Sequence, residues 1–144
     1  MFKESVDDRL SSWAQHRVSV ETSSNPLEDV WNFWKDAPYI PYNNKVDPYH
    51  SRNWPTPWEM IIENKYDDFT KAIMIGKTLK FTQRFKDSAI QIRTYVDNSR
   101  NIMYNVVMID ESWIINYNDN GPVPIKDLPA SFSLENLIEL ETAR

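Results

Sequence analysis

Residues that could carry out acid–base or nucleophilic chemistry are sparse in this sequence. It has two histidines, His16 and His50, and no cysteine. A cysteine nucleophile, a thiolate metal site and a disulfide are therefore excluded, and neither histidine has a second one at zinc-binding spacing. His16 closes a predicted helix, where a partly charged imidazole is favoured. We expect both histidines to be structural or surface residues, and we predict no metal site and no cofactor.

Two pairs of adjacent carboxylates, Asp67-Asp68 and Asp110-Glu111, are the other candidates for chemistry. Adjacent carboxylates can hold Mg²⁺ or share acid–base work. A structural explanation fits as well, because negative charge is favoured in the first turn of a helix and acidic residues are common in tight turns. We favour the structural explanation. A glycine-rich phosphate loop is excluded, since the only two glycines, Gly76 and Gly121, stand 45 positions apart.

Composition limits the partners. The chain has 144 residues and a net charge of −5, which argues against a general binder of phosphate backbones. Basic residues do alternate with Phe81 and Phe85 near positions 77–86, but a solvated helix face produces the same pattern, so we predict no nucleic-acid partner. No apolar run approaches the roughly 18 residues of a membrane span, and Met1–Ser5 is too polar for a signal peptide. We therefore predict no membrane partner.

The elements that would position these groups are helical first and extended later. Helical spacing of apolar residues predicts helices over residues 3–16 and 65–83. Two more begin at strong start signals, one at Asn25-Pro26 and one at Thr56-Pro57, where Glu59 completes a capping box. Small residues in the 65–83 helix, Ala72 and Gly76, would let another element approach closely.

Beyond Asp87 the apolar period changes from 3.6 to 2, which predicts strands over residues 89–96, 102–109 and 113–117. The segment from Ser133 onward fits either a closing helix or an edge strand, and we favour the helix. Together these features predict a single α+β domain spanning residues 1–144, with N-terminal helices followed by a three- to four-stranded antiparallel sheet arranged as a meander.

Residues 36–53 lie between the second and third predicted helices and combine three prolines with Tyr39, Tyr42 and Tyr49. We expect this segment to be an ordered strap over the core, and we predict that its tyrosines bind a partner. Trp54 and Trp58 flank the next helix start. They either clamp that helix onto the core or extend the partner-binding patch, and we favour the clamp.

With these residues identified, the chain resembles an uncharacterised family of small tailed-bacteriophage proteins. The specific motif is W-P-T-P-W-E at Trp54–Glu59, and weaker matches extend the resemblance over about residues 30–118. They lie at Phe33–Pro38, Tyr66–Leu79 and Ile109–Tyr117. The resemblance implies a phage protein without assigned catalytic residues.

A more distant likeness is to the core of transglutaminase-like and papain-like enzymes, in which a helix that opens with a cysteine packs on an antiparallel sheet carrying histidine and Asp or Asn. Here the helix opens near Asp67, the second strand offers Tyr104 and Asn105, and the third offers Asn116. The likeness implies a possible pocket formed by Asp67, Tyr104 and Asn116. Because the nucleophile and the base are missing, acyl transfer is not expected.

These observations favour a non-enzymatic bacteriophage protein that acts through protein–protein contacts, as a virion structural or assembly component. Its partners would be other phage proteins or a host protein, and it would reside in the virion or the host cytoplasm. The alternatives are a degenerate transglutaminase-like, papain-like or carboxylate-based enzyme, and a small phage inhibitor of a host enzyme. The sequence does not indicate an oligomeric state.

Overall fold

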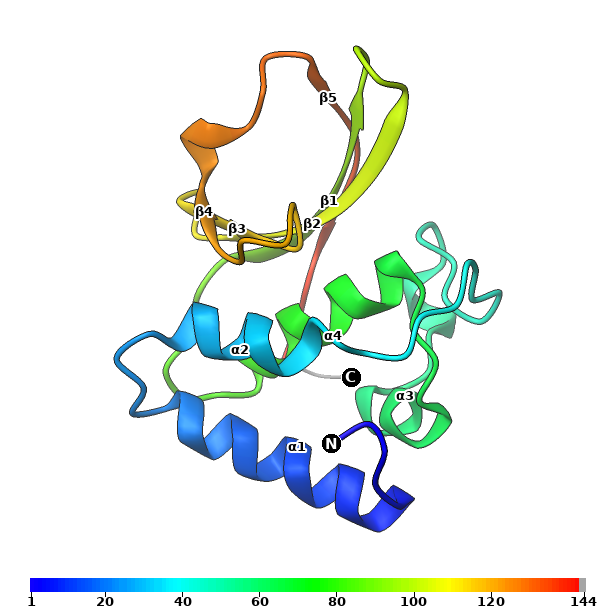
Figure 1. Ribbon diagram of the computed structural model, residues 1–144, viewed down its shortest axis with the longest axis vertical. Helices are drawn as coiled ribbons and strands as arrows, with labels where there is room; N and C mark the ends of the chain where they lie inside the picture. Colours follow the sequence, from blue (N-terminus) through cyan, green and yellow to red (C-terminus); the bar gives the residue numbers. More distant parts are fainter. Residues whose placement is uncertain (143–144) are drawn as a thin grey trace.

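The computed structural model describes residues 1–142, in which four α-helices precede a five-stranded antiparallel sheet (Figure 1). The helices are α1 (Val6–Val20), α2 (Pro26–Trp34), α3 (Pro57–Glu63) and α4 (Asp68–Lys80), with a 3₁₀ turn η1 (Ser51–Asn53) between α2 and α3. The strands are β1 (Ile90–Asp97), β2 (Ile102–Ile109), β3 (Trp113–Ile115), β4 (Val123–Pro124) and β5 (Phe132–Glu139), with a second 3₁₀ turn η2 (Ile125–Asp127) after β4. None of the helices in residues 1–142 is both long and apolar enough to cross a bilayer.

The predicted α+β class is confirmed, with a larger sheet than expected. The strand order is β4-β3-β2-β1-β5, so the first four strands form the predicted meander and β5 adds a fifth strand beside β1. The helix favoured from Ser133 onward is wrong. That segment pairs with the whole length of β1, from Asp97↔Phe132 to Gln91↔Glu139, because β1 would otherwise leave a long row of backbone groups without partners.

The bounds of two helices also differ from the sequence expectation. The first helix runs over Val6–Val20, because the Ser5 hydroxyl accepts a hydrogen bond from Asp8 N and caps it there. The last helix begins at Asp68, because the Asp67 side chain accepts from Thr70 N at 2.7 Å. The capping box at α3 is confirmed, with Glu59 N to Thr56 Oγ1 at 3.2 Å and Thr56 N to Glu59 Oε1 at 3.0 Å.

Helix α4 is the centre of the fold. Figure 1 shows the helices grouped on one side of the sheet, with α1 farthest from it, and α4 contacts β1 and β2 as well as α1 and α2. Its side chains are therefore buried around nearly the whole circumference. The close approach predicted at Gly76 is confirmed: a Cβ atom there would lie 2.3 Å from Leu140 Cδ1, just beyond β5.

A single hydroxyl joins three of the helices. Thr78 of α4 is fully buried, and its Oγ1 accepts hydrogen bonds from Trp13 Nε1 of α1 at 2.9 Å and from Trp34 Nε1 of α2 at 3.0 Å. It donates to Met74 O of its own helix at 2.6 Å. Because both indoles are 0% exposed, neither N–H group has access to water. The Thr78 hydroxyl is thus the partner that makes their burial possible.

The opposite face of the sheet carries a second apolar cluster. Tyr95, Val106, Met108 and Ile114 are buried there. Their cover comes from the segment that runs from β4 through η2, including Ile125 and Leu128, and arches away from the helices before returning as β5 (Figure 1). The sheet is therefore enclosed by helices on one face and by its own chain on the other.

The Thr78 contacts predict a specific loss of stability. Thr78→Val keeps the shape of the side chain but leaves two buried indole N–H groups without an acceptor, so the free energy of unfolding should fall by roughly 2 to 5 kcal/mol. Thr70→Val is the matched control, since Thr70 lies on the same helix, is 0% exposed and has a hydroxyl without a hydrogen-bond partner among residues 1–142. Its effect should stay below about 1 kcal/mol in urea denaturation. Equal losses in the two variants would contradict the role given to Thr78.

Candidate functional site

Residues 36–53, the strap, are held against the core by backbone contacts. Its first part pairs with Tyr66, two residues before α4, through Ile40 N to Tyr66 O at 3.0 Å and Tyr66 N to Pro38 O at 2.9 Å. Further along, Asn43 N donates to Asp67 Oδ2 at 3.0 Å, and Val46 is 2% exposed. The strap is therefore an ordered part of the fold, as the sequence predicted.

The second half of the strap is fixed by Asp47. Its backbone oxygen accepts from Trp54 Nε1 at 2.6 Å, and its Oδ1 accepts from Tyr49 N at 2.9 Å. The hydrogen bond from Tyr49 N, followed by that from the His50 ring, lowers the pKa of Asp47. The carboxylate thus stays charged and keeps the backbone at Tyr49 in one position.

A groove of about 450 Å³, the strap groove, lies between the strap and the sheet. The sheet side is formed by β1, β2 and β5, and the N-terminal end of α4 closes the floor. Its lining residues are Pro41, Tyr42, Val46, Pro48, Tyr49, Asp67, Asp68, Phe69, Thr94, Val96, Met103, Asn105, Glu135 and Asn136. Most of the surface is apolar, with polar groups concentrated at the floor and along β5. Cavities of this size and character bind ligands or partner side chains in other proteins.

The structure divides the five residues predicted to bind a partner. Tyr42 and Tyr49 line the strap groove and are 71% and 75% exposed. Tyr39 is equally exposed but does not line the groove. Trp54 is buried against Phe69, with ring centroids 5.7 Å apart, so it anchors the strap and does not offer a contact surface.

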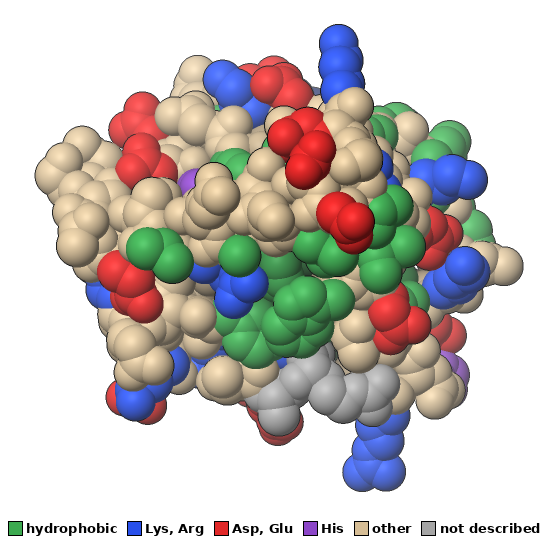
Figure 2. All heavy atoms as spheres, turned by 90° about the horizontal axis from the view of Figure 1, so that it is seen from below, with side chains coloured by type: hydrophobic (Ala, Val, Ile, Leu, Met, Phe, Trp, Pro, Cys, Tyr) green, Lys and Arg blue, Asp and Glu red, His purple; other side chains and the backbone are tan. Residues whose placement is uncertain are grey.

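Trp58 belongs to another surface. Its indole packs edge-on against Trp13 and lies 5.3 Å from the Phe81 ring, at the far end of α4 from the groove. The twelve residues from Phe69 to Phe81 correspond to roughly 18 Å along a helix axis. Figure 2, which shows the molecule from the α1 side, reveals a central apolar patch among charged side chains on that face. The clamp predicted for Trp58 is present, although 42% of the residue is exposed.

The pocket predicted from Asp67, Tyr104 and Asn116 forms around Asp68 instead. Asp68 Oδ2 accepts from Asn105 N at 3.3 Å and from Asn105 Nδ2 at 3.1 Å, and Asp68 Oδ1 accepts from Asn116 Nδ2 at 3.2 Å. Asp67 points toward the strap, where its Oδ2 accepts from Asn43 N, and its Oδ1 accepts from Thr70 N of α4. Consecutive residues in a helix project in directions about 100° apart. Because α4 begins at Asp68 and not at Asp67, it is Asp68 that faces Asn105 and Asn116, and Asp67 faces the strap.

A smaller cavity of about 270 Å³ lies on the other side of Asp68 and is lined in part by Lys71, Tyr104, Asn116 and Asp119. Asn116 has a left-handed backbone, with φ of 72°, which asparagine tolerates better than most residues. Its amide also donates to Asn105 O at 2.9 Å. Tyr104 and Asn116 thus line one cavity, whereas Asp67 lines the strap groove.

The Asp68–Asn105–Asn116 network brings together a helix start and two strands, the arrangement seen in the transglutaminase-like and papain-like likeness. Its groups are a carboxylate and two amides, and both carboxylate oxygens already accept hydrogen bonds. An amide cannot take up the proton of a nucleophile in acyl transfer. The network is suited to bracing α4 against β2 and β3.

The second acidic pair lies at a distance from this network. Asp110 follows β2 in a tight turn, with φ of 52°, and its Oδ1 accepts from Ala89 N. Five residues of strand separate it from Asn105, which corresponds to roughly 16 Å. Within the described part of the chain no three His, Cys, Asp or Glu side chains cluster in a way that could hold a metal ion. Shared acid–base work by Asp68 and Asp110 is therefore excluded.

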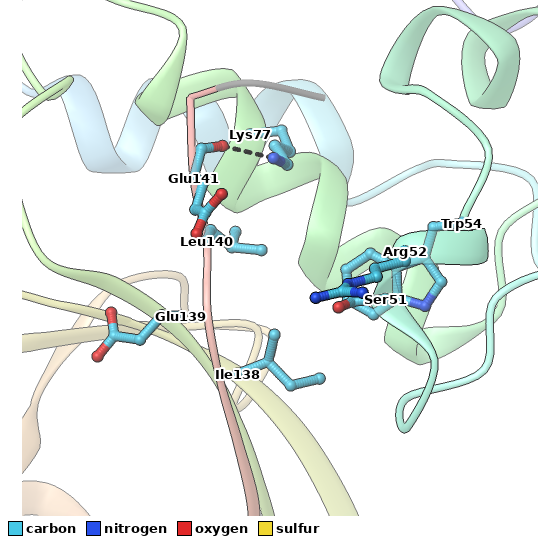
Figure 3. Close-up of a pocket in the computed structure, with 8 residues that line it drawn as sticks. All are labelled: Ser51, Arg52, Trp54, Lys77, Ile138, Glu139, Leu140 and Glu141. Carbon is cyan, nitrogen blue, oxygen red and sulfur yellow. Dashed lines mark hydrogen bonds between the residues drawn. The ribbon is translucent and has the colours of Figure 1, made fainter.

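A further cavity, of about 340 Å³, lies where the end of β5 meets η1 and α4 (Figure 3). In Figure 3, Ile138 and Leu140 extend toward the segment that carries Ser51 and Arg52, whereas Glu139 points away. Lys77 is 4% exposed and its Nζ donates to Glu141 O at 2.5 Å. These contacts hold the end of β5 against α4.

The two histidines have different environments, and neither faces the strap groove. His50 is exposed and bonds Asp47 at 2.8 Å. His16 stacks on Phe33 with ring centroids 4.1 Å apart, and burial lowers its pKa to about 4 against a weaker opposing effect of Asp29. The predicted charged imidazole at a helix end is wrong, because α1 continues to Val20 and His16 is neutral within it.

No family model matches this sequence, and no curated protein matches it.

The Asp68 network predicts a structural role that a stability measurement can separate from a catalytic one. Asp68→Ala leaves the Asn105 and Asn116 donors without their acceptor and should lower the free energy of unfolding by about 2 to 4 kcal/mol. Removing a catalytic carboxylate usually leaves stability unchanged or raises it. Asp119→Ala, an exposed change at the same cavity, should stay within about 0.5 kcal/mol. A stable Asp68→Ala protein would contradict the bracing role.

Burial of neutral His16 predicts a dependence of stability on pH. The unfolded chain takes up a proton near pH 6.5, whereas folded His16 does so only near pH 4. The free energy of unfolding should therefore fall as the pH drops from 6.5 to 4. His16→Leu should lose this contribution in urea denaturation at a series of pH values, and His50→Gln should retain it. Parallel pH profiles for His16→Leu and the wild type would refute the assignment.

Proposed function

We propose that this chain is a non-enzymatic bacteriophage protein that binds another protein through the strap groove, as a virion structural or assembly component. The observation that carries the proposal is the pair Tyr42 and Tyr49. Both are more than 70% exposed, yet they belong to a strap whose backbone is hydrogen-bonded to the rest of the fold at Ile40, Asn43 and Asp47.

Exposed tyrosines on a fixed backbone are suited to binding. Tyrosine is enriched at protein interfaces and often dominates their binding energy, since a large ring is buried at the cost of few rotatable bonds. Because the strap is already ordered, binding would not have to fix its backbone. The apolar lining contributed by Val96 and Met103 continues the same surface onto the sheet.

The phage and virion parts of the proposal rest on the W-P-T-P-W-E resemblance at Trp54–Glu59. In the fold this motif ends the strap and starts α3: Trp54 anchors the strap through Asp47 O, and Thr56 and Glu59 form the capping box. The motif therefore contains a residue, Trp54, that holds the strap in place. The partner would be another phage protein or a host protein.

A second candidate is a degenerate enzyme, which the convergence of Asp68, Asn105 and Asn116 favours. In that case the strap groove would bind a former substrate, and the chain would retain recognition without turnover. A small phage inhibitor of a host enzyme would use the same surface as the first candidate and differ only in its partner.

Affinity capture tests the proposal. Tagged wild-type protein is recovered from phage-infected host cells, and its co-purifying proteins are identified by mass spectrometry. Phage capsid, neck or tail proteins in near-stoichiometric amounts would support assembly, and a single host enzyme would indicate inhibition. Tyr42→Ala combined with Tyr49→Ala should reduce the captured partner about tenfold or more, because interface tyrosines can each contribute 2 kcal/mol or more.

Tyr39→Ala is the matched control, since Tyr39 is as exposed as the other two tyrosines but lies outside the groove lining. It should capture the partner as well as the wild type does. Undiminished capture by the double variant would overturn the strap groove as the binding surface. Absence of any co-purifying protein would overturn the proposal itself.

A further inference from the structure

The charged residues that line the strap groove are all acidic. Three carboxylates, those of Asp67, Asp68 and Glu135, line it, and its lining contains no lysine, arginine or histidine. Two of them are at the start of α4, and the third, Glu135, is on β5. An occupant would therefore meet negative charge from two sides.

None of the three carboxylates is neutralised by a cation within residues 1–142. Asp67 accepts only from the backbone N–H groups of Asn43 and Thr70, and Asp68 only from amide groups. Glu135 is exposed and forms neither a hydrogen bond nor an ion pair with the described residues. The negative charge of the groove is thus available to an incoming group.

The apolar lining suits the stem of a long basic side chain. Tyr42 and Tyr49 offer aromatic rings at the mouth, which attract a cation over their faces. Val96, Met103 and Phe69 provide apolar surface between the mouth and the floor, where the methylene groups of lysine or arginine pack while the charged end reaches a carboxylate. An acidic group or a phosphate would be repelled at the same place.

The neighbouring strand favours a protein segment over a free small molecule. β5 is the last strand on its side of the sheet, and within residues 1–142 no strand pairs with its outer edge. An extended segment that lies along this edge can use the free backbone groups and direct alternate side chains toward the groove. Glu135 interrupts the β1–β5 register, and both Glu135 and Asn136 line the groove.

We propose that the partner is an extended protein segment that inserts one arginine or lysine side chain into the strap groove, between the two tyrosines and the carboxylates of Asp67, Asp68 and Glu135. This inference rests on the proposed function and specifies its partner. It predicts binding that weakens with salt and that depends on the central cation.

The test uses blocked nine-residue peptides that alternate threonine and valine around a central arginine, lysine, norleucine or glutamate. Binding to the full chain is followed by the amide NMR signals of Thr94, Val96 and Asn105. The arginine and lysine peptides should shift these signals, and their affinity should drop when salt rises from about 50 to 500 mM. The norleucine peptide should bind about tenfold more weakly, and the glutamate peptide should leave the signals unchanged.

Glu135→Gln removes one of the groove charges and should lower the affinity for the arginine peptide about two- to fivefold, as expected for a partly exposed ion pair. Glu139→Gln is the matched control on the same strand, because Glu139 is exposed and does not line the groove. N-acetylarginine amide tests the need for a segment and should bind far more weakly than the arginine peptide.

Three results would overturn the inference. Equal affinity for norleucine and arginine would show that the groove has no preference for a cation. Equal affinity for N-acetylarginine amide and the arginine peptide would assign the groove to a small cationic molecule. Unchanged amide signals with every peptide would rule out an extended protein segment as the occupant of the groove. The proposed function fails separately, when no protein co-purifies with the tagged chain from infected cells.

Discussion

The helical half of this protein depends on the hydrogen bonds that the Thr78 hydroxyl accepts from Trp13 and Trp34. Six tryptophans in 144 residues provide much of the core, and each buried indole brings a donor that must be satisfied. Thr78 satisfies two of them at once, and it can do so only if α1 and α2 meet α4 at the same turn. The position of α4 then decides where its first residues, Asp67 and Asp68, lie relative to the sheet.

From that end of α4 two consecutive carboxylates organise different parts of the molecule. Asp67 turns outward and holds the strap through Asn43, whereas Asp68 turns toward the sheet and joins Asn105 and Asn116. The same two residues form the floor of the strap groove. The carboxylates that stabilise the strap and brace α4 therefore also give the groove negative charge, and in the proposed function stability and recognition would depend on the same groups.

The Asp68 network shows that an arrangement typical of catalysis can be built from groups that brace a fold. A helix start, a strand and a strand end converge, as in enzymes that use a nucleophile, a base and an orienting group. Here both carboxylate oxygens accept hydrogen bonds from amide donors, and Asn116, one of the donors, has a left-handed backbone. Side-chain chemistry decides between the two uses, since amides hold a position without moving protons.

Local patterns in the sequence were sufficient for the order of the four helices and the first three strands, the α3 capping box, the close approach at Gly76 and an ordered strap, because each depends largely on neighbouring residues. The closing segment was predicted wrongly because its pairing with β1 joins residues about 40 positions apart, and no local preference encodes such a contact. The choice between Asp67 and Asp68 likewise depended on where the helix begins, which is uncertain by a residue or two in any sequence pattern. Only the tertiary structure decided which aromatic residues are anchors and which are exposed, and which carboxylates share the groove. Burial and proximity arise from contacts between distant segments, and these form only when the whole chain has packed.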